Sequence, residues 1–133
     1  MKTMEKKEIN ERNNMLFSEV EPSCQMSMAF WDGEPYVRLF SEKRRFSFMI
    51  PLKEIDSHLQ AVRKNLDLYL SMKNQVGLLP FSIKTFHGFT LWFNAKNAGV
   101  CLNESFRLLS SEEEFQAYER NIRNLQHLMK ATV

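Results

Sequence analysis

The chain has 133 residues, of which 44% are apolar and 26% charged, and its formal net charge is +2 at pH 7. These values are typical of one globular domain with a hydrophobic core and exclude an intrinsically disordered chain. No apolar run reaches the roughly 18 residues of a membrane-crossing helix, and the first residues mix Lys with Glu, unlike a signal peptide. We therefore expect a soluble intracellular protein, in the cytoplasm or nucleus, without a membrane partner.

The first 22 residues are polar apart from a short apolar patch at residues 15–17, and Pro22 ends this segment. The pattern predicts a flexible N-terminal arm. The remaining residues, 23–133, are expected to form a single domain. Positive charge is concentrated in the middle of the chain, because residues 24–109 have eleven basic and seven acidic side chains whereas each flanking segment has a net charge of −1.

After the arm, apolar residues alternate with polar ones, which is the period of a β-strand. We predict a strand over residues 26–31, a turn at 32–35 with Gly33 at positive φ, and strands over 36–40 and 45–50. The charged residues 41–44 form the loop between the last two strands.

The period then changes to that of a helix, which begins near Pro51 and ends before Gly77 and Pro80. Its apolar stripe comprises Ile55, Leu59, Val62 and Leu66. The end of this helix is more apolar than one buried face requires, which favours contact with another subunit. The residues in excess are Leu68, Tyr69, Leu70 and Met72.

A second series of strands is predicted over residues 81–86, 89–93, 99–102 and 106–109, with turns at 87–88 and 94–97. Ser110 and Ser111 each precede a Glu by three residues, which is the capping box of a helix start. The predicted apolar stripe of this second helix comprises Phe115, Tyr118, Ile122, Leu125 and Leu128.

The two series have the same order of elements, and Trp31 and Phe86 lie 55 residues apart, as do Gly33 and Gly88. We predict an α+β fold in which antiparallel strands followed by one helix occur twice (β-β-β(-β)-α). The two repeats cover about residues 24–76 and 78–133, and the helices pack on one sheet face, which leaves the other face open to a ligand.

Strand alternation assigns the strand residues to a core face and an outer face. The predicted core residues are Met26, Met28, Phe30, Val37, Leu39, Phe46, Phe48, Ile50, Ile83, Phe89, Leu91, Phe93, Val100 and Leu102. The predicted outer residues are Trp31, Tyr36, Arg38, Phe40, Arg45, Ser47, Lys84, Phe86, Thr90 and Trp92. The outer set is aromatic and basic and has no acidic member.

This outer composition predicts a binding surface for single-stranded DNA or RNA, because stacking on an aromatic side chain contributes about 1–3 kcal/mol per base while Arg and Lys contact phosphates. Three loop cations, Lys43, Arg44 and Lys96, extend it. The candidate stacking residues are Trp31, Tyr36, Phe86 and Trp92. The candidate phosphate contacts are Arg38, Lys43, Arg44, Arg45, Lys84 and Lys96.

The same residues also fit a protein-interaction module or inhibitor whose aromatic face docks on a protein partner, because aromatic residues and Arg are enriched at protein interfaces. The aromatic residues would then form a subunit interface or a second core layer. With either function we expect a homo-oligomer, a dimer or a tetramer.

No pattern in the sequence predicts an enzyme, a metal site or a cofactor. His58, His87 and His127 are scattered without Cys, Asp or Glu at ligand spacing, and there is no GxSxG, P-loop, GxGxxG or HExxH motif. The two cysteines, Cys24 and Cys101, form no CxxC pair, which predicts buried free thiols in a reducing compartment.

The segment "FTLWFNAKNAGVCLNESFRLLSSEEEFQAY" leads from a strand through a turn and an apolar strand beginning at Gly99 to a capped helix. With the less similar segment "RRFSFMIPLKEIDSHL", it gives residues 24–130 an order of elements that resembles the Whirly proteins, the purine-rich-element-binding proteins and the positive-cofactor-type transcriptional coactivators. The resemblance implies a sheet-face or hairpin-edge site for single-stranded nucleic acid, oligomerisation through helices or sheet edges, and a role in transcription, replication or repair. The chain departs from this group in being only mildly basic.

Overall fold

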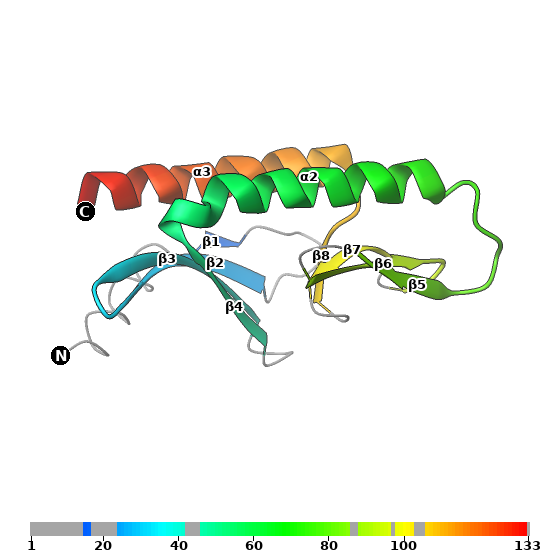
Figure 1. The fold of residues 1–133 in the computed structure, drawn as a ribbon, viewed down its shortest axis with the longest axis horizontal. Coiled ribbons are helices and arrows are strands. Elements are labelled where there is room, and N and C mark those ends of the chain that lie inside the picture. Colours follow the sequence, from blue (N-terminus) through cyan, green and yellow to red (C-terminus); the bar gives the residue numbers. More distant parts are fainter. Residues whose placement is uncertain are drawn as a thin grey trace. The chain divides into compact units, whose positions relative to one another are not determined.

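The computed structural model describes residues 15–16, 24–41, 46–85, 88–96, 98–102 and 106–132. They form an α+β fold with two antiparallel sheets and two long helices (Figure 1). The chain divides into two compact units, of which the first comprises Met1–Asp56 and Ala117–Val133 and the second Ser57–Gln116. The first unit thus contains the N-terminal sheet and most of the C-terminal helix, and the second contains the other sheet and most of the first long helix. The sequence had instead predicted that each sheet groups with the helix that follows it.

The sheet of the first unit has four strands in sequential order: β1 (Met15–Leu16), β2 (Cys24–Trp31), β3 (Glu34–Ser41) and β4 (Phe46–Pro51). A two-residue turn joins β2 to β3, with φ of 52° at Asp32 and 79° at Gly33. Two successive positive φ angles are those of a type I′ turn, which matches the twist of the strands it joins. The turn is shorter than predicted because Glu34 pairs with Trp31 and extends β3.

The core of the first unit combines one face of this sheet with the C-terminal part of α3 (Glu112–Thr132). The buried sheet residues include Met26, Met28, Val37, Leu39 and Ile50. The buried helix residues are Tyr118, Ile122, Leu125, Gln126 and Met129. Leu128 was predicted in this stripe, but it is 46% exposed, and the fully buried Met129 takes the next inward position because four residues from Leu125 keep to the same face.

The sheet of the second unit also has four strands in sequential order: β5 (Phe81–Lys84), β6 (Phe89–Phe93), β7 (Gly99–Leu102) and β8 (Phe106–Leu109). A short 3₁₀ turn, η1 (Leu52–Glu54), leads into α2 (Ile55–Met72). The core combines α2 residues with the predicted inner face of the sheet, and Tyr69 stacks on Phe93 with ring centroids 5.2 Å apart. The buried α2 residues in this unit are Leu59, Ala61, Val62, Asn65, Leu66 and Tyr69.

The start of α3 has the predicted capping box. The backbone N–H of Glu114 donates to Ser111 Oγ at 3.1 Å, and the Glu114 carboxylate accepts from the backbone N–H of Ser110 at 2.9 Å. These bonds satisfy N–H groups that have no partner within the helix, so α3 begins where the sequence pattern indicates.

Three further expectations concern the arm, the cysteines and membrane crossing. Of residues 1–22, only Met15 and Leu16 are described, and they pair with β2, so the rest of the expected arm lies outside the described residues. Cys101 is fully buried and forms no disulfide, as predicted, and the side chain of Cys24 is not described. In the described part of the chain, neither long helix has the apolar length required to cross a bilayer.

Candidate binding surface on the first sheet

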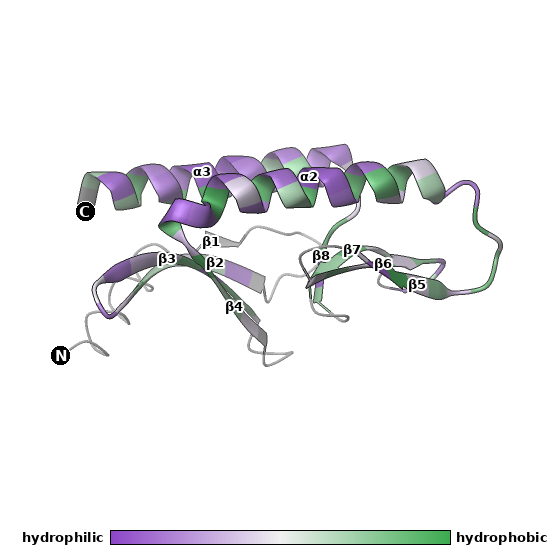
Figure 2. Ribbon diagram, viewed as in Figure 1, coloured by the Kyte–Doolittle hydropathy of each residue, from purple (hydrophilic) through white to green (hydrophobic). Residues whose placement is uncertain are grey.

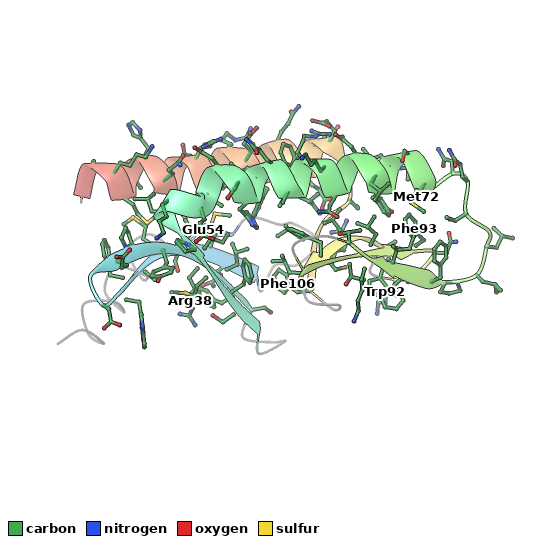
Figure 3. The ribbon with its side chains drawn as sticks, in the orientation of Figure 1. Arg38, Glu54, Met72, Trp92, Phe93 and Phe106 are labelled. Atoms are coloured by element: carbon green, nitrogen blue, oxygen red, sulfur yellow. The ribbon has the colours of Figure 1, made fainter. Side chains whose placement is uncertain are left out.

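The side of the first sheet opposite its core residues presents a mixed aromatic and polar surface, which we call the outer face. The strand register places its members in rows: Gln25, Phe40 and Ser47; Ser27, Arg38 and Met49; Ala29, Tyr36 and Pro51; and Trp31 with Glu34. Figure 3 shows Arg38 on the side of the sheet that faces away from α3. The outer face is therefore the surface of this unit on which a ligand can meet strand side chains.

Arg38 occupies the middle strand of the outer face and is held in place by two neighbours. Its guanidinium carbon lies 4.4 Å from the centroid of the Phe40 ring, and its Nε donates to Ser47 Oγ at 3.2 Å. Within the described part of the chain, no carboxylate lies at salt-bridge distance from Arg38, whereas Arg63, Arg107 and Arg123 each pair with an acid. A guanidinium without a carboxylate partner in the described ranges can bind an anionic ligand through its two terminal nitrogens.

Two further predicted aromatic residues share this face with Arg38. Trp31 is 58% exposed, and Tyr36 is half-buried two positions before Arg38 on the same strand. The adjacent β2 residues Ser27 and Ala29 have no exposed surface, so the larger side chains of β3 form the surface at this place. The structure thus brings Trp31, Tyr36 and Arg38 together on one sheet face.

The outer face also contains residues that sequence reasoning missed. Glu34 was assigned to a turn but lies in β3 opposite Trp31, so the face has one acid at its hairpin end. Met49 lies beside Arg38 and is half-buried. Its alternation with Phe48 and Ile50 was the signal that assigns it to this face.

The remaining described candidates belong to the second unit. Lys84 and Lys96 are exposed and Trp92 is half-buried, and Figure 3 shows Trp92 on the opposite side of its sheet from Phe93 and from Met72 of α2. Lys43, Arg44, Arg45 and Phe86 lie outside the described residues. The predicted platform is therefore divided between two sheets, and only its first-unit part forms a described cluster.

The outer side of the second sheet is less open than alternation predicts. Thr90 was expected to face solvent, but it is only 3% exposed, and its cross-strand neighbour Cys101 is fully buried. Arg107, which pairs with Cys101, is 8% exposed and donates from Nε to the carbonyl oxygen of Ala98 at 3.1 Å. Solvent therefore reaches this side mainly along β5, at Ser82 and Lys84.

A pocket of about 340 Å³ adjoins the hairpin end of the first sheet. It is lined by Glu34, Pro35, Leu52, Lys53, Asp56, Gln126 and Lys130. A hydrogen bond from Arg123 is the main cause that lowers the pKa of Asp56, so this carboxylate is ionised at neutral pH. Acids and lysines are mixed in this lining, and no His or Cys is among the described lining residues.

Neither the placement of possible metal ligands in the described residues nor comparison with known proteins assigns a ligand to the outer face. Across the described ranges, no three His, Cys, Asp or Glu side chains are placed to hold a metal ion. Comparison with models of protein families, with curated proteins and with solved structures found no match to the chain. The outer face is therefore characterised by its own described residues, which include an arginine stacked on Phe40, three partly exposed aromatic rings and one acid.

Proposed function

We propose that the chain binds single-stranded DNA or RNA on the outer face of the β1–β4 sheet and acts in transcription, replication or repair without being an enzyme. Arg38 is the observation that carries the proposal. Its guanidinium is stacked on Phe40, hydrogen-bonded to Ser47 and without a carboxylate partner in the described ranges. Such an arginine loses little side-chain freedom when it contacts a phosphate.

The neighbours of Arg38 support stacking of bases beside that phosphate contact. Tyr36 lies two residues from Arg38 along β3, a spacing of about 7 Å, and Trp31 lies toward the hairpin end of the same face. Aromatic rings bind bases of any sequence because every base has a π-face. Lys43, Arg44 and Arg45, in the connection to β4, would continue the phosphate path.

We also propose that the chain contains two copies of one structural unit and forms a homo-oligomer, as the resemblance to Whirly-type proteins implies. Each sheet has four antiparallel strands in sequential order and precedes one amphipathic helix in the chain. Leu68, near the end of α2, is 42% exposed and provides apolar surface for a subunit contact.

Tryptophan fluorescence with mixed-sequence oligonucleotides tests the proposed function. At about 50 mM salt we expect binding to DNA or RNA, with log affinity falling linearly against log salt concentration. Arg38→Ala should weaken binding and reduce the salt slope by about one, because one phosphate contact is lost. Arg120→Ala removes an exposed arginine from α3 in the same unit and should change neither quantity.

The proposal is wrong if the wild-type protein binds no oligonucleotide at this salt concentration. It is also wrong if Arg38→Ala and Arg120→Ala have equal effects, because binding would then reflect overall charge and not the outer face.

Docking of a protein partner on the same face is the second candidate function. It is favoured by Glu34, whose charge repels phosphate, and by the half-buried Met49 and Phe40, which provide apolar contact. Under this candidate, Trp31→Ala abolishes self-association or capture of a purified partner while oligonucleotides do not bind. Under the first, Glu34→Gln increases oligonucleotide affinity because it removes a repulsive charge.

A further inference from the structure

The connection between α2 and β5 presents two adjacent leucines to solvent. Leu78 is 95% exposed and Leu79 is 80% exposed, and both belong to the second unit. Figure 2 shows hydrophobic colouring where this connection runs into β5. Single exposed leucines are ordinary, whereas two adjacent leucines with almost their whole surface in water form a small apolar patch to which a partner can bind.

Hydrogen bonds attach this connection to the residue that follows β6. The side-chain amide of Asn94, which follows β6, donates to the carbonyl oxygens of Gly77 and Leu79, the second at 3.3 Å. Asn94 itself has a φ of 55°, in the left-handed region, so a particular backbone conformation presents its amide to the loop. Pro80 restricts the residue before it to an extended conformation. Hydrogen bonds and Pro80 therefore fix the conformation of the loop in which the leucines are exposed.

The stretch of sequence on either side of the leucines has basic but no acidic side chains. Residues 68–103 contain no Asp or Glu and three lysines, Lys73, Lys84 and Lys96. All three lysines are exposed. Lys73 lies just beyond the end of α2, and Lys96 lies two residues after the Asn94 that binds the loop. Lys84 lies three residues further along β5 than Phe81. The partner should therefore be anionic and able to accommodate the apolar side chains of Leu78 and Leu79.

The charge and the exposure of this surface discriminate among possible occupants. A second copy of the chain would bring two acid-free, lysine-bearing surfaces together, which like charges oppose. A nucleic acid offers phosphates but no apolar medium for leucines. A protein groove requires a large complementary surface, whereas this patch consists of two side chains on a loop. An anionic bilayer accepts such a patch without shape complementarity and attracts lysines to its headgroups.

We propose that Leu78 and Leu79 insert into the interfacial region of an anionic lipid bilayer, with Lys73, Lys84 and Lys96 contacting the headgroup phosphates. The attachment is peripheral and reversible, because it combines a small apolar insertion with a few basic contacts. The expectation that the protein has no membrane partner rested on the lack of a membrane-crossing segment, which surface attachment does not require. This inference is independent of the proposed nucleic-acid binding, which concerns the first unit.

Sedimentation of the full chain with lipid vesicles tests the inference. We expect binding to vesicles of phosphatidylcholine and phosphatidylserine in equal parts, weaker binding to phosphatidylcholine alone, and release by salt. Leu78→Ser combined with Leu79→Ser should reduce binding about tenfold, since the apolar insertion is lost. Leu128→Ser, at a 46% exposed position in the first unit, is the matched control and should bind as the wild type does.

A second measurement reports insertion directly. Leu79→Trp should add fluorescence that brominated phosphatidylcholine quenches in mixed vesicles, beyond any quenching of Trp31 and Trp92 in the wild type. The inference is overturned if the wild type does not bind mixed vesicles, as expected for an acidic protein partner. It is equally overturned if the double serine variant binds like the wild type, or if that variant alone loses self-association, as expected for a second copy.

Discussion

Arg107 in β8 forms a largely buried ion pair with Glu114 in the first turn of α3, with Nη2 and Oε1 3.0 Å apart and side chains 10% and 26% exposed. Burial by itself would raise the pKa of Glu114, but hydrogen bonds from Arg107 and Ser110 outweigh it and leave the pKa below its usual value. The same arginine also donates to the carbonyl oxygen of Ala98. This pair therefore connects the last strand, the turn before β7 and the helix start.

Glu114→Gln should destabilise the protein strongly, because it leaves the Arg107 cation buried without a counter-charge. Breaking such a pair costs about 3–5 kcal/mol of the free energy of unfolding. Urea unfolding at pH 7 measures this quantity. Asp67→Asn is the control, since Asp67 pairs with Arg63 at a more exposed site (61% and 33%) and should cost less than about 1 kcal/mol. Equal losses for the two variants would contradict the assignment.

His58 should make stability depend on pH between about 6.5 and 4. Burial lowers its pKa to about 4, and its ring lies 6.1 Å from that of Phe89. As the pH falls through this window, the unfolded chain binds a proton that the folded chain does not, so the free energy of unfolding decreases by about 1.4 kcal/mol per pH unit. Above pH 6.5 the contribution is constant.

Comparison of the wild type with His58→Leu by urea unfolding at several pH values isolates this contribution, because the carboxylates titrate in both proteins. The variant should lose the part of the slope that His58 supplies. A resonance of the His58 imidazole that titrates near pH 6.5 in the folded protein would contradict the prediction.

Alanine substitutions at three glycines of the second unit should rank by local crowding. A Cβ at Gly99 would lie 2.7 Å from the carbonyl oxygen of Leu109, at a φ of 138°, and should cost about 1–3 kcal/mol. Gly88, with a φ of 79° but nothing within 4 Å, should cost about 1 kcal/mol. Gly77, which also has nothing within 4 Å, should change stability by less than about 0.5 kcal/mol. Thermal unfolding of the three variants gives the order.

Met129→Ala and Leu128→Ala should differ sharply although the residues are adjacent on α3. Met129 is fully buried and its truncation should cost about 2–5 kcal/mol, whereas Leu128 is 46% exposed and should cost less than about 0.5 kcal/mol. Chemical unfolding of both variants checks which face of α3 is buried in the first unit. The reverse order would show that the periodicity first inferred from the sequence was right.

Local patterns predicted the secondary structure well. The bounds of β6, β7 and β8 agree with the prediction, the four apolar residues of the α2 stripe are buried, and the capping box begins α3. Strand alternation also assigned Trp31, Tyr36 and Arg38 correctly to one face of the first sheet. These features depend on residues at most four positions apart or on neighbours along a hairpin.

Long-range contacts explain what the prediction missed. Alternation placed Thr90 away from the core of its own sheet but did not show that this position is buried. Spacing at three or four residues allowed Leu128 and Met129 equally as the last inward position of α3. The pairing of Arg107 with Glu114 and the Asn94 bonds that display Leu78 and Leu79 join residues that no local motif connects.

Taken alone, the amino-acid sequence determined the α+β class, the order of the elements and the side on which most strand residues lie, because backbone geometry imposes periods of 2 and 3.6 residues on any apolar pattern. Only the tertiary structure decided that the strands form two separate sheets and which arginines pair with acids. It also decided that the first sheet is grouped with most of α3 and the second with most of α2. Those outcomes depend on which surfaces exclude water together, and burial of apolar area is non-directional, so no short pattern encodes it.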